Sequence, residues 1–159
     1  MNLSPSGGAH RPDRGAPIVL RLLPHVHHPP ARVLVPDVGE GNEVRALDAR
    51  GYRVTVMGGV VPTPGVAHAA GTFLENAPVG FDLVCEAGAF GALQGAARAR
   101  YVDAAAQALR PGGLLFGAFR ADDAGAGELI ALMSPRFDVA RLEPSGALGG
   151  WLEAIFVRR

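Results

Sequence analysis

The stretch VLVPDVGEGNEV, residues 33–44, carries the clearest fold signal in this chain. It begins with an apolar run, passes through a turn in which one residue separates Gly39 from Gly41, and enters a segment with helical spacing of apolar residues. A short continuous apolar run is typical of a strand buried on both faces. A glycine turn between such a strand and a helix N-terminus leaves room and free amide groups for a nucleotide-like ligand. The stretch therefore predicts a strand–loop–helix unit of an α/β fold.

Segments with the spacing of strands and of helices alternate along the rest of the chain. Strands are predicted over 32–36, 52–58, 81–88, 113–119, 137–144 and 150–159, with a short apolar element at 18–23 and a weak third segment at 72–80. Helices are predicted over 41–51, 96–113 and 125–136. This order predicts a doubly wound α/β fold with a mostly parallel sheet. The loop SGALGG between the last two strands is so short that the C-terminal strand must be antiparallel.

Length and composition indicate one soluble globular domain, which we expect over residues 18–159 after a flexible leader at 1–17. The 159 residues contain 15 basic and 15 acidic side chains, and this balance argues against a nucleic-acid partner. The single cysteine, Cys85, lies among apolar neighbours and is expected to be buried. No apolar run approaches the roughly 20 residues that cross a membrane, and no signal peptide is recognisable, so we expect a cytoplasmic protein without membrane contact.

Four segments, in this order, resemble a class I S-adenosylmethionine-dependent methyltransferase, and most closely its thiopurine/thiol methyltransferase-like branch. The segments are RVLVPDVGEGNEVRALDARGYRVTVMG (32–58), GFDLVCEAGAFGAL (80–93), RARYVDAAAQALRPGGLLFGAF (98–119), and RFDVARLEP (136–144) with GWLEAIFVRR (150–159). The resemblance covers about residues 31–159. It implies a Rossmann-like methyltransferase fold, S-adenosyl-L-methionine as the cofactor, and direct transfer of the methyl group to a small molecule.

The resemblance also implies which residues form the site. The expected cofactor contacts are Asp37, Val38, Gly39, Glu40, Gly41, Met57, Gly58, Thr72, Phe73 and Glu86. Glu86 is in addition the one candidate catalytic residue, as a base near the transferred methyl group; the alternative is a solvated carboxylate at a strand end. Phe90, Arg98 and Tyr101 are expected at the substrate rim, although Phe90 is also explained by core packing and the other two by orienting their helix.

Three positions depart from the family pattern, and all three belong to the expected cofactor site. Asp37 replaces a glycine of the first loop, and Thr72 replaces an aspartate. Met57 and Gly58 stand where an acid usually accepts both ribose hydroxyls. Each hydrogen bond to an ionised acceptor contributes about 1.5–3 kcal/mol. These departures leave open a weakened cofactor site, a changed ligand, or a domain that no longer uses the cofactor.

Two functions remain as alternatives. The first is a small-molecule methyltransferase, and the second is a catalytically inactive methyltransferase-like domain that serves as a binding or assembly partner. A dinucleotide oxidoreductase is set aside because GEGNEV lacks a third glycine and VMGG lacks the acid. The cluster of His25, His27 and His28 has no nearby Cys, Asp or Glu, which favours an exposed loop over a metal site. The short leader leaves the crevice open, which is consistent with a homodimer.

Overall fold

The computed structural model describes residues 15–39, 41–59, 64–120, 125–145 and 149–159. Its helices are α1 (Gly15–Leu22), the 3₁₀ turn η3 (Leu23–His25), α2 (Asn42–Ala49), α3 (Phe73–Asn76), the 3₁₀ turn η4 (Phe90–Ala92), α4 (Ala96–Ala108) and α5 (Gly125–Met133). Its strands are β1 (Arg32–Val35), β2 (Arg53–Val56), β3 (Ala67–His68), β4 (Phe81–Glu86), β5 (Leu109–Arg120), β6 (Phe137–Pro144) and β7 (Trp151–Arg158). Most of the predicted leader, residues 1–14, lies outside the described residues, whereas residues 15–17 begin α1.

The strands form one sheet in the order β3-β2-β1-β4-β5-β7-β6. The first five are parallel, with Val33 beside Val54 in β2 and beside Leu83 in β4. β7 is antiparallel to both of its neighbours and lies between β5 and β6. This confirms the predicted mostly parallel sheet with an antiparallel C-terminal strand. The last strand is antiparallel because the loop after β6 is too short for a crossover helix.

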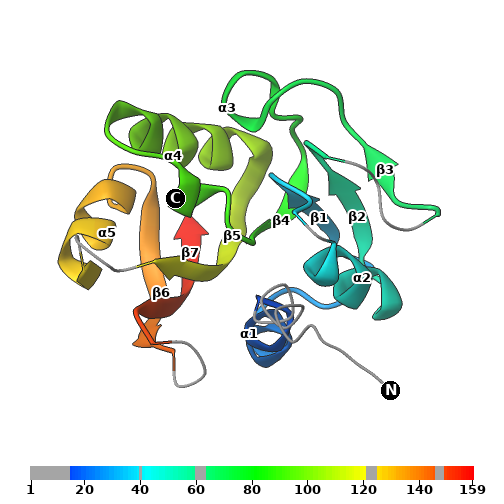
Figure 1. Cartoon of the computed structure of the whole chain (residues 1–159), viewed down its shortest axis with the longest axis horizontal. Coiled ribbons are helices and arrows are strands. Elements are labelled where there is room, and N and C mark those ends of the chain that lie inside the picture. Colours follow the sequence, from blue (N-terminus) through cyan, green and yellow to red (C-terminus); the bar gives the residue numbers. More distant parts are fainter. Residues whose placement is uncertain (1–14, 40, 60–63, 121–124, 146–148) are drawn as a thin grey trace, which may run out of the picture.

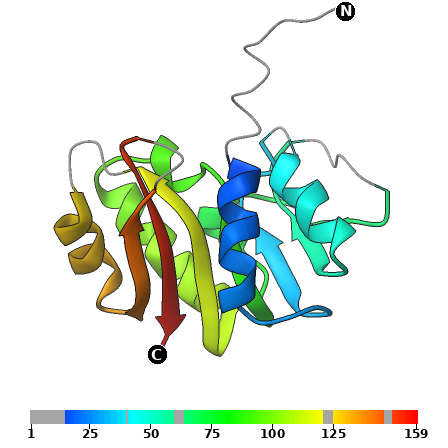
Figure 2. The same cartoon turned by 90° about the horizontal axis from the view of Figure 1, so that it is seen from below.

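Helices cover both faces of this sheet (Figures 1 and 2). α1 and α2 pack on one face, and α3, α4 and α5 pack on the other. Each face carries its own hydrophobic core, and one of these cores contains an unbroken run of tilted and edge-to-face aromatic contacts. The rings in that run are Phe73, Tyr101, Phe90, Phe119, Phe156 and Phe137. Their neighbouring centroids lie 5.0–6.4 Å apart, a favourable range for aromatic pairs.

Differences from the sequence-based expectation are clear at the first element and at the end of α4. The apolar element expected at 18–23 is the helix α1, which continues directly into η3. Helix α4 ends at Ala108 rather than at the glycines after Pro111, because Leu109 is already extended and pairs with Phe81 of β4. A Cβ built on Gly113 would lie 3.1 Å from the carbonyl oxygen of Asp82. The Pro-Gly-Gly sequence therefore lies within β5, where Gly113 passes close to the backbone of β4, and it does not cap the helix.

The weak third segment expected at residues 72–80 contains the short helix α3. The strand β3 comes earlier and pairs with β2 through two residues, Ala67 and His68. Cys85 is fully buried, as predicted, and burial raises the pKa of its thiol.

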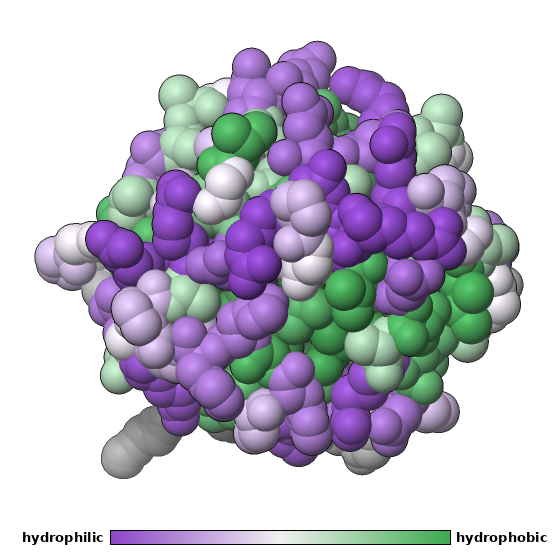
Figure 3. Space-filling view, turned by 180° about the vertical axis from the view of Figure 1, so that it is seen from behind, coloured by the Kyte–Doolittle hydropathy of each residue, from purple (hydrophilic) through white to green (hydrophobic). Residues whose placement is uncertain are grey.

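Seen from behind, hydrophilic side chains dominate, with a hydrophobic area to the lower right of the centre (Figure 3). Among the described residues the large hydrophobic side chains that are exposed are Val79, Ile130 and Val139. None of the described helices combines the length and the apolar character needed to cross a membrane.

Candidate functional site

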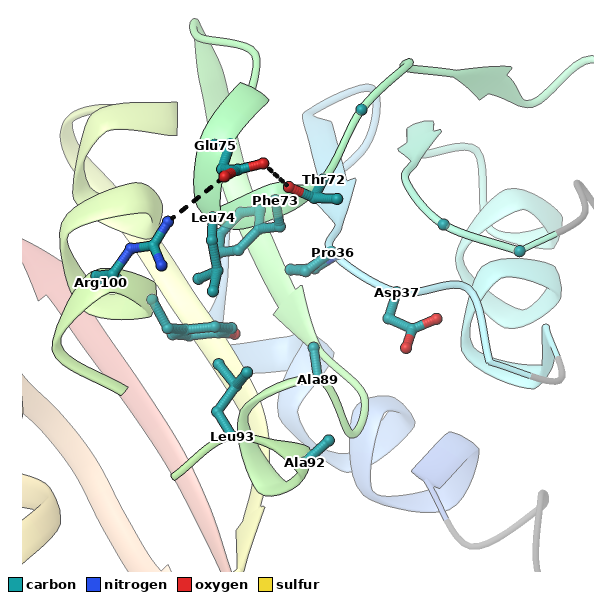
Figure 4. Close-up of a pocket in the computed structure, with 14 residues that line it drawn as sticks. Pro36, Asp37, Thr72, Phe73, Leu74, Glu75, Ala89, Ala92, Leu93 and Arg100 are labelled. Atoms are coloured by element: carbon teal, nitrogen blue, oxygen red, sulfur yellow. Dashed lines mark hydrogen bonds and ion pairs between the residues drawn. The ribbon is translucent and has the colours of Figure 1, made fainter. Parts of the chain in front are cut away.

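A cavity of about 520 Å³ opens at the carboxyl ends of β1, β2 and β4 (Figure 4). This is the edge at which open α/β sheets bind ligands, and the volume lies in the range of small-molecule sites. Its lining residues come from the loops after β1, β2, β3 and β4 and from α3 and α4. They are Pro36, Asp37, Gly58, Gly59, Gly71, Thr72, Phe73, Leu74, Glu75, Ala89, Ala92, Leu93, Arg100 and Tyr101.

The loop after β1 turns sharply into α2. Gly39 and Gly41 both have positive φ angles, 56° and 88°, and Gly41 is the N-cap of the helix. The backbone N–H of Gly39 donates a hydrogen bond to Oδ1 of Asp37, 3.1 Å away, which is a turn that aspartate supports well. Val38 points inward and is 2% exposed, so its side chain belongs to the core and not to the cavity. Glu40 lies outside the described residues.

The end of β2 contributes glycines to the cavity. Met57 is completely buried in the hydrophobic core, and its side chain does not line the cavity. Gly58 and Gly59 follow it with φ angles of 68° and 64°, and both line the cavity. A Cβ on Gly59 would lie only 2.3 Å from Cγ1 of Val38, so a larger residue there would have to displace that side chain. At the position where the sequence resemblance implies an acid, the cavity is therefore lined by the backbone of Gly58 and Gly59.

A polar rim lies on the α3 side of the cavity. The hydroxyl of Thr72 donates a hydrogen bond to Oε1 of Glu75, 3.4 Å away, and Oε2 of Glu75 lies 4.0 Å from a guanidinium nitrogen of Arg100 (Figure 4). Both charged side chains are more than half exposed, so water weakens the attraction between them. Phe73 is buried beneath this rim, with its ring 5.0 Å from the ring of Tyr101.

Glu86, at the end of β4, is 1% exposed, so the interpretation as a solvated carboxylate is wrong. Its Oε2 accepts hydrogen bonds from the backbone N–H groups of Gly88 at 2.8 Å and Phe90 at 3.0 Å. Its Oε1 accepts one from the hydroxyl of Tyr101 at 2.5 Å. Burial raises the pKa of Glu86 to about 7, although these three hydrogen bonds oppose the shift, and the nearby charge of Asp37 adds to it.

The three residues expected at the substrate rim have different positions. Phe90 is 2% exposed and packs edge-to-face on Tyr101 and Phe119, so the core explanation is confirmed. The guanidinium of Arg98 lies 4.7 Å from the centre of the Phe90 ring, and its Nε donates a hydrogen bond to the carbonyl oxygen of Leu93. Only Tyr101 of the three lines the cavity.

Several lining residues were not predicted from the sequence. Arg100 and Glu75 supply the charges of the rim, and Leu74, Leu93 and Ala92 supply apolar surface. Arg100 gave no signal of this role, because adjacent residues on a helix, such as Arg100 and Tyr101, do not face each other. The apolar residues gave no such signal, because their role follows from where the loops fold.

The histidine cluster lies away from the cavity. Residues 25–28 lead into the amino end of β1, and Nε2 of His27 is 3.4 Å from the carbonyl oxygen of Gly112 at the start of β5. His25 and His28 are exposed, as predicted. In the part of the chain that the structure describes, no group of three or more His, Cys, Asp or Glu side chains could hold a metal ion.

Comparisons with known proteins identify the fold. No family model matches the chain, and no curated protein matches it. The solved structures that it resembles include 1,6-didemethyltoxoflavin-N1-methyltransferase of Burkholderia thailandensis, with bound 1,6-didemethyltoxoflavin and S-adenosylhomocysteine (TM-score 0.78, 19% identity, 96% of this chain and 81% of that one). A TehB-like SAM-dependent methyltransferase of Corynebacterium glutamicum is also similar (0.73, 19%, 89% and 88%). So is the N-methyltransferase NodS of Bradyrhizobium japonicum in complex with S-adenosylhomocysteine (0.68, 21%, 90% and 85%). The chain therefore has the class I methyltransferase fold, as predicted.

Proposed function

We propose that this protein binds S-adenosylmethionine in the cavity at the carboxyl edge of the sheet and transfers its methyl group to a small molecule. The observation that carries the proposal is the cavity itself, which has glycine loops on one side and apolar side chains on the other. Similar structures that contain S-adenosylmethionine or S-adenosylhomocysteine support this choice of ligand. Membership of the thiopurine/thiol branch is part of the proposal and rests on the four sequence segments.

The residues that line the cavity fit such a cofactor. A Cβ on Gly39 would meet no atom within 4 Å, so there is open space beside the first loop. Leu74 and Leu93 offer apolar surface for a flat base, while Thr72 offers polar atoms at its edge. The bound cofactor supplies a methyl group on a positively charged sulfonium.

Charge in the site favours a cationic ligand over a pyrophosphate. The carboxylate of Asp37 lies in the loop where a dinucleotide-binding fold holds phosphate, and it repels a phosphate there. Asp37 is the carboxylate on this side of the cavity, and its charge also helps to raise the pKa of the nearby, buried Glu86. The same charge attracts a sulfonium, which supports methyl transfer over dinucleotide chemistry.

Glu86 acts in this proposal by positioning and not as a base. Both of its oxygens already accept hydrogen bonds from the protein, and it is almost completely buried. It therefore holds the loop that carries Ala89 and Leu93 into the cavity wall. Direct methyl transfer depends mainly on bringing acceptor and donor into line, so it does not require an acid–base pair.

Calorimetric titration with S-adenosylmethionine and S-adenosylhomocysteine tests the proposal. We expect micromolar binding of both ligands. The variant Ala92→Trp places a large ring in the cavity and should weaken binding at least about tenfold, a loss of roughly 1.4 kcal/mol. The matched control is Ala99→Trp, an exposed position on α4 that does not line the cavity, and it should bind like the wild type.

No heat with either ligand would contradict the proposal and favour an inactive methyltransferase-like domain that binds a partner. If binding is found, incubation with thiol, amine and halide acceptors should produce S-adenosylhomocysteine, detected by mass spectrometry. Faster turnover of thiols than of amines would support the proposed branch. The possible homodimer stays a prediction, which size-exclusion chromatography with light scattering checks.

A further inference from the structure

We infer that Asp37 binds the two neighbouring hydroxyl groups of the ligand's ribose, from the β1 side of the cavity, in place of an acid at the end of β2. This inference rests on the proposed function and assigns one part of the ligand to one side chain. Three observations support it: the position of the Asp37 carboxylate, its free capacity to accept hydrogen bonds, and the residues that surround it.

The carboxylate of Asp37 lies beside the end of β2. A Cβ built on Gly58 would be 3.5 Å from Oδ1 of Asp37 and 4.0 Å from its Cγ, which is ordinary van der Waals contact. An acidic side chain at position 58 would therefore begin next to the carboxylate of Asp37, which comes from the loop after the neighbouring strand β1. Asp37 thus places a carboxylate close to the end of β2, where the sequence itself has no acid.

Asp37 still has capacity to accept hydrogen bonds. Within the described part of the chain its one hydrogen bond comes from the N–H of Gly39 to Oδ1, and it forms no ion pair there. The residue is exposed and lines the cavity, on a different side from the paired Glu75 and Arg100 (Figure 4). An ionised carboxylate has about four acceptor positions, so it can bind both hydroxyls of a diol.

The surroundings favour a diol over the other groups of the ligand. Gly58 and Gly59 form the facing wall, and without side chains they allow a sugar ring to approach the backbone. In dinucleotide-binding folds an acid near the end of the second strand binds ribose hydroxyls, so this is the position where a ribose is expected. Glu86, the other carboxylate nearby, is occupied by three donors and cannot take this role.

Two ligands and one variant separate the diol from the ammonium group. S-adenosylhomocysteine contains both groups, whereas 5′-methylthioadenosine contains the diol but no amino-acid part. The variant D37N keeps the shape of the side chain and removes its charge. We expect D37N to weaken the binding of both ligands by the same factor, about 10- to 100-fold in calorimetry. Removal of the 2′-hydroxyl from methylthioadenosine should weaken binding to the wild type much more than binding to D37N.

A second variant moves the carboxylate. The change D37G removes it, and G58D in the D37G background returns it from β2, which should recover part of the lost affinity. The control D138N alters an exposed carboxylate on β6 and should leave affinity unchanged. Circular dichroism melting shows that each variant is folded before titration.

The outcomes distinguish the two levels of the proposal. If the wild type binds neither ligand, the proposed function fails and this inference fails with it. If the wild type binds both and D37N binds them equally well, only the role of Asp37 is overturned. If D37N weakens S-adenosylhomocysteine but not methylthioadenosine, Asp37 binds the ammonium group and the diol assignment is wrong.

Discussion

The hydroxyl of Tyr101 donates a hydrogen bond to the carboxylate of Glu86, and both side chains are buried between β4 and α4. This contact joins the end of a central strand to the helix that carries Arg100 into the cavity rim. Because Glu86 also accepts two backbone hydrogen bonds, it organises the loop between strand and helix. The stability of the protein and the shape of the cavity are thus coupled to one ionisable group.

The first prediction concerns pH. Burial raises the pKa of Glu86 from 4.5 to about 7, so the folded state holds the proton more tightly than the unfolded state. The resulting stabilisation is full below about pH 4.5 and is lost as the pH rises through 7. We expect the free energy of unfolding to fall by up to about 3 kcal/mol between pH 5 and pH 8, at 1.4 kcal/mol per pKa unit. Urea denaturation of the wild type and of Glu86→Gln over this range measures the difference, and equal slopes for both would contradict the prediction.

The second prediction concerns Tyr101→Phe. Removal of the hydroxyl leaves Oε1 of Glu86 without its donor, which should cost about 1–3 kcal/mol of stability. It should also raise the pKa of Glu86 further, because that hydrogen bond lowers it. The matched control is Tyr52→Phe, which loses a hydrogen bond to the carbonyl oxygen of His27 and should leave the pH profile unchanged. Denaturation at several pH values checks both effects, and parallel profiles for the two variants would argue against the coupling.

The third prediction uses two glycines that share a positive φ angle. Gly59 and Gly65 have φ angles of 64° and 89°, so alanine at either position costs about 1–2 kcal/mol for the backbone. At Gly59 the new Cβ would also collide with Val38, whereas at Gly65 it would meet no atom within 4 Å. Gly59→Ala should therefore be less stable than Gly65→Ala by about 1–3 kcal/mol. Thermal melts of the two variants decide this, and equal melting temperatures would show that the loop relaxes freely.

The fourth prediction concerns the contact between α1 and β7. Arg21 donates a hydrogen bond to Glu153, which is 6% exposed, so removal of the arginine leaves a buried carboxylate without its partner. We expect Arg21→Ala to destabilise the protein by about 2 kcal/mol, and Glu153→Gln in the same background to recover part of this loss. Chemical denaturation of the single and double variants gives the coupling. Additive effects would mean that the contact contributes little.

Sequence reasoning predicted those elements whose signals are local. The bounds of β6 were predicted residue for residue, because Phe137 and Pro144 mark its two ends. The end of α4 was misplaced because Pro111 and the following glycines are a usual helix stop, and only pairing with Phe81 shows that the strand begins earlier. Such pairing depends on contacts between distant parts of the chain, which local spacing does not report.

The same limit applies to the candidate site. The glycine loop and Asp37 were found from the sequence because they follow directly from a strand. The burial of Glu86 was not, since it depends on two backbone N–H groups and on Tyr101, which lies 15 residues further along. Arg100 and Glu75 enter the rim from separate helices, and only the fold places them on the same cavity.

The position of β7 between β5 and β6 has a consequence for how the chain folds during synthesis. In the described sheet β6 pairs with β7 and with no other strand, so it has no partner until residues 151–158 have left the ribosome. Until then β5 also presents an open edge, because its residues from Leu114 to Arg120 pair with β7. Unpaired strand edges promote aggregation, so translation of the last strand is the step that protects the nascent protein.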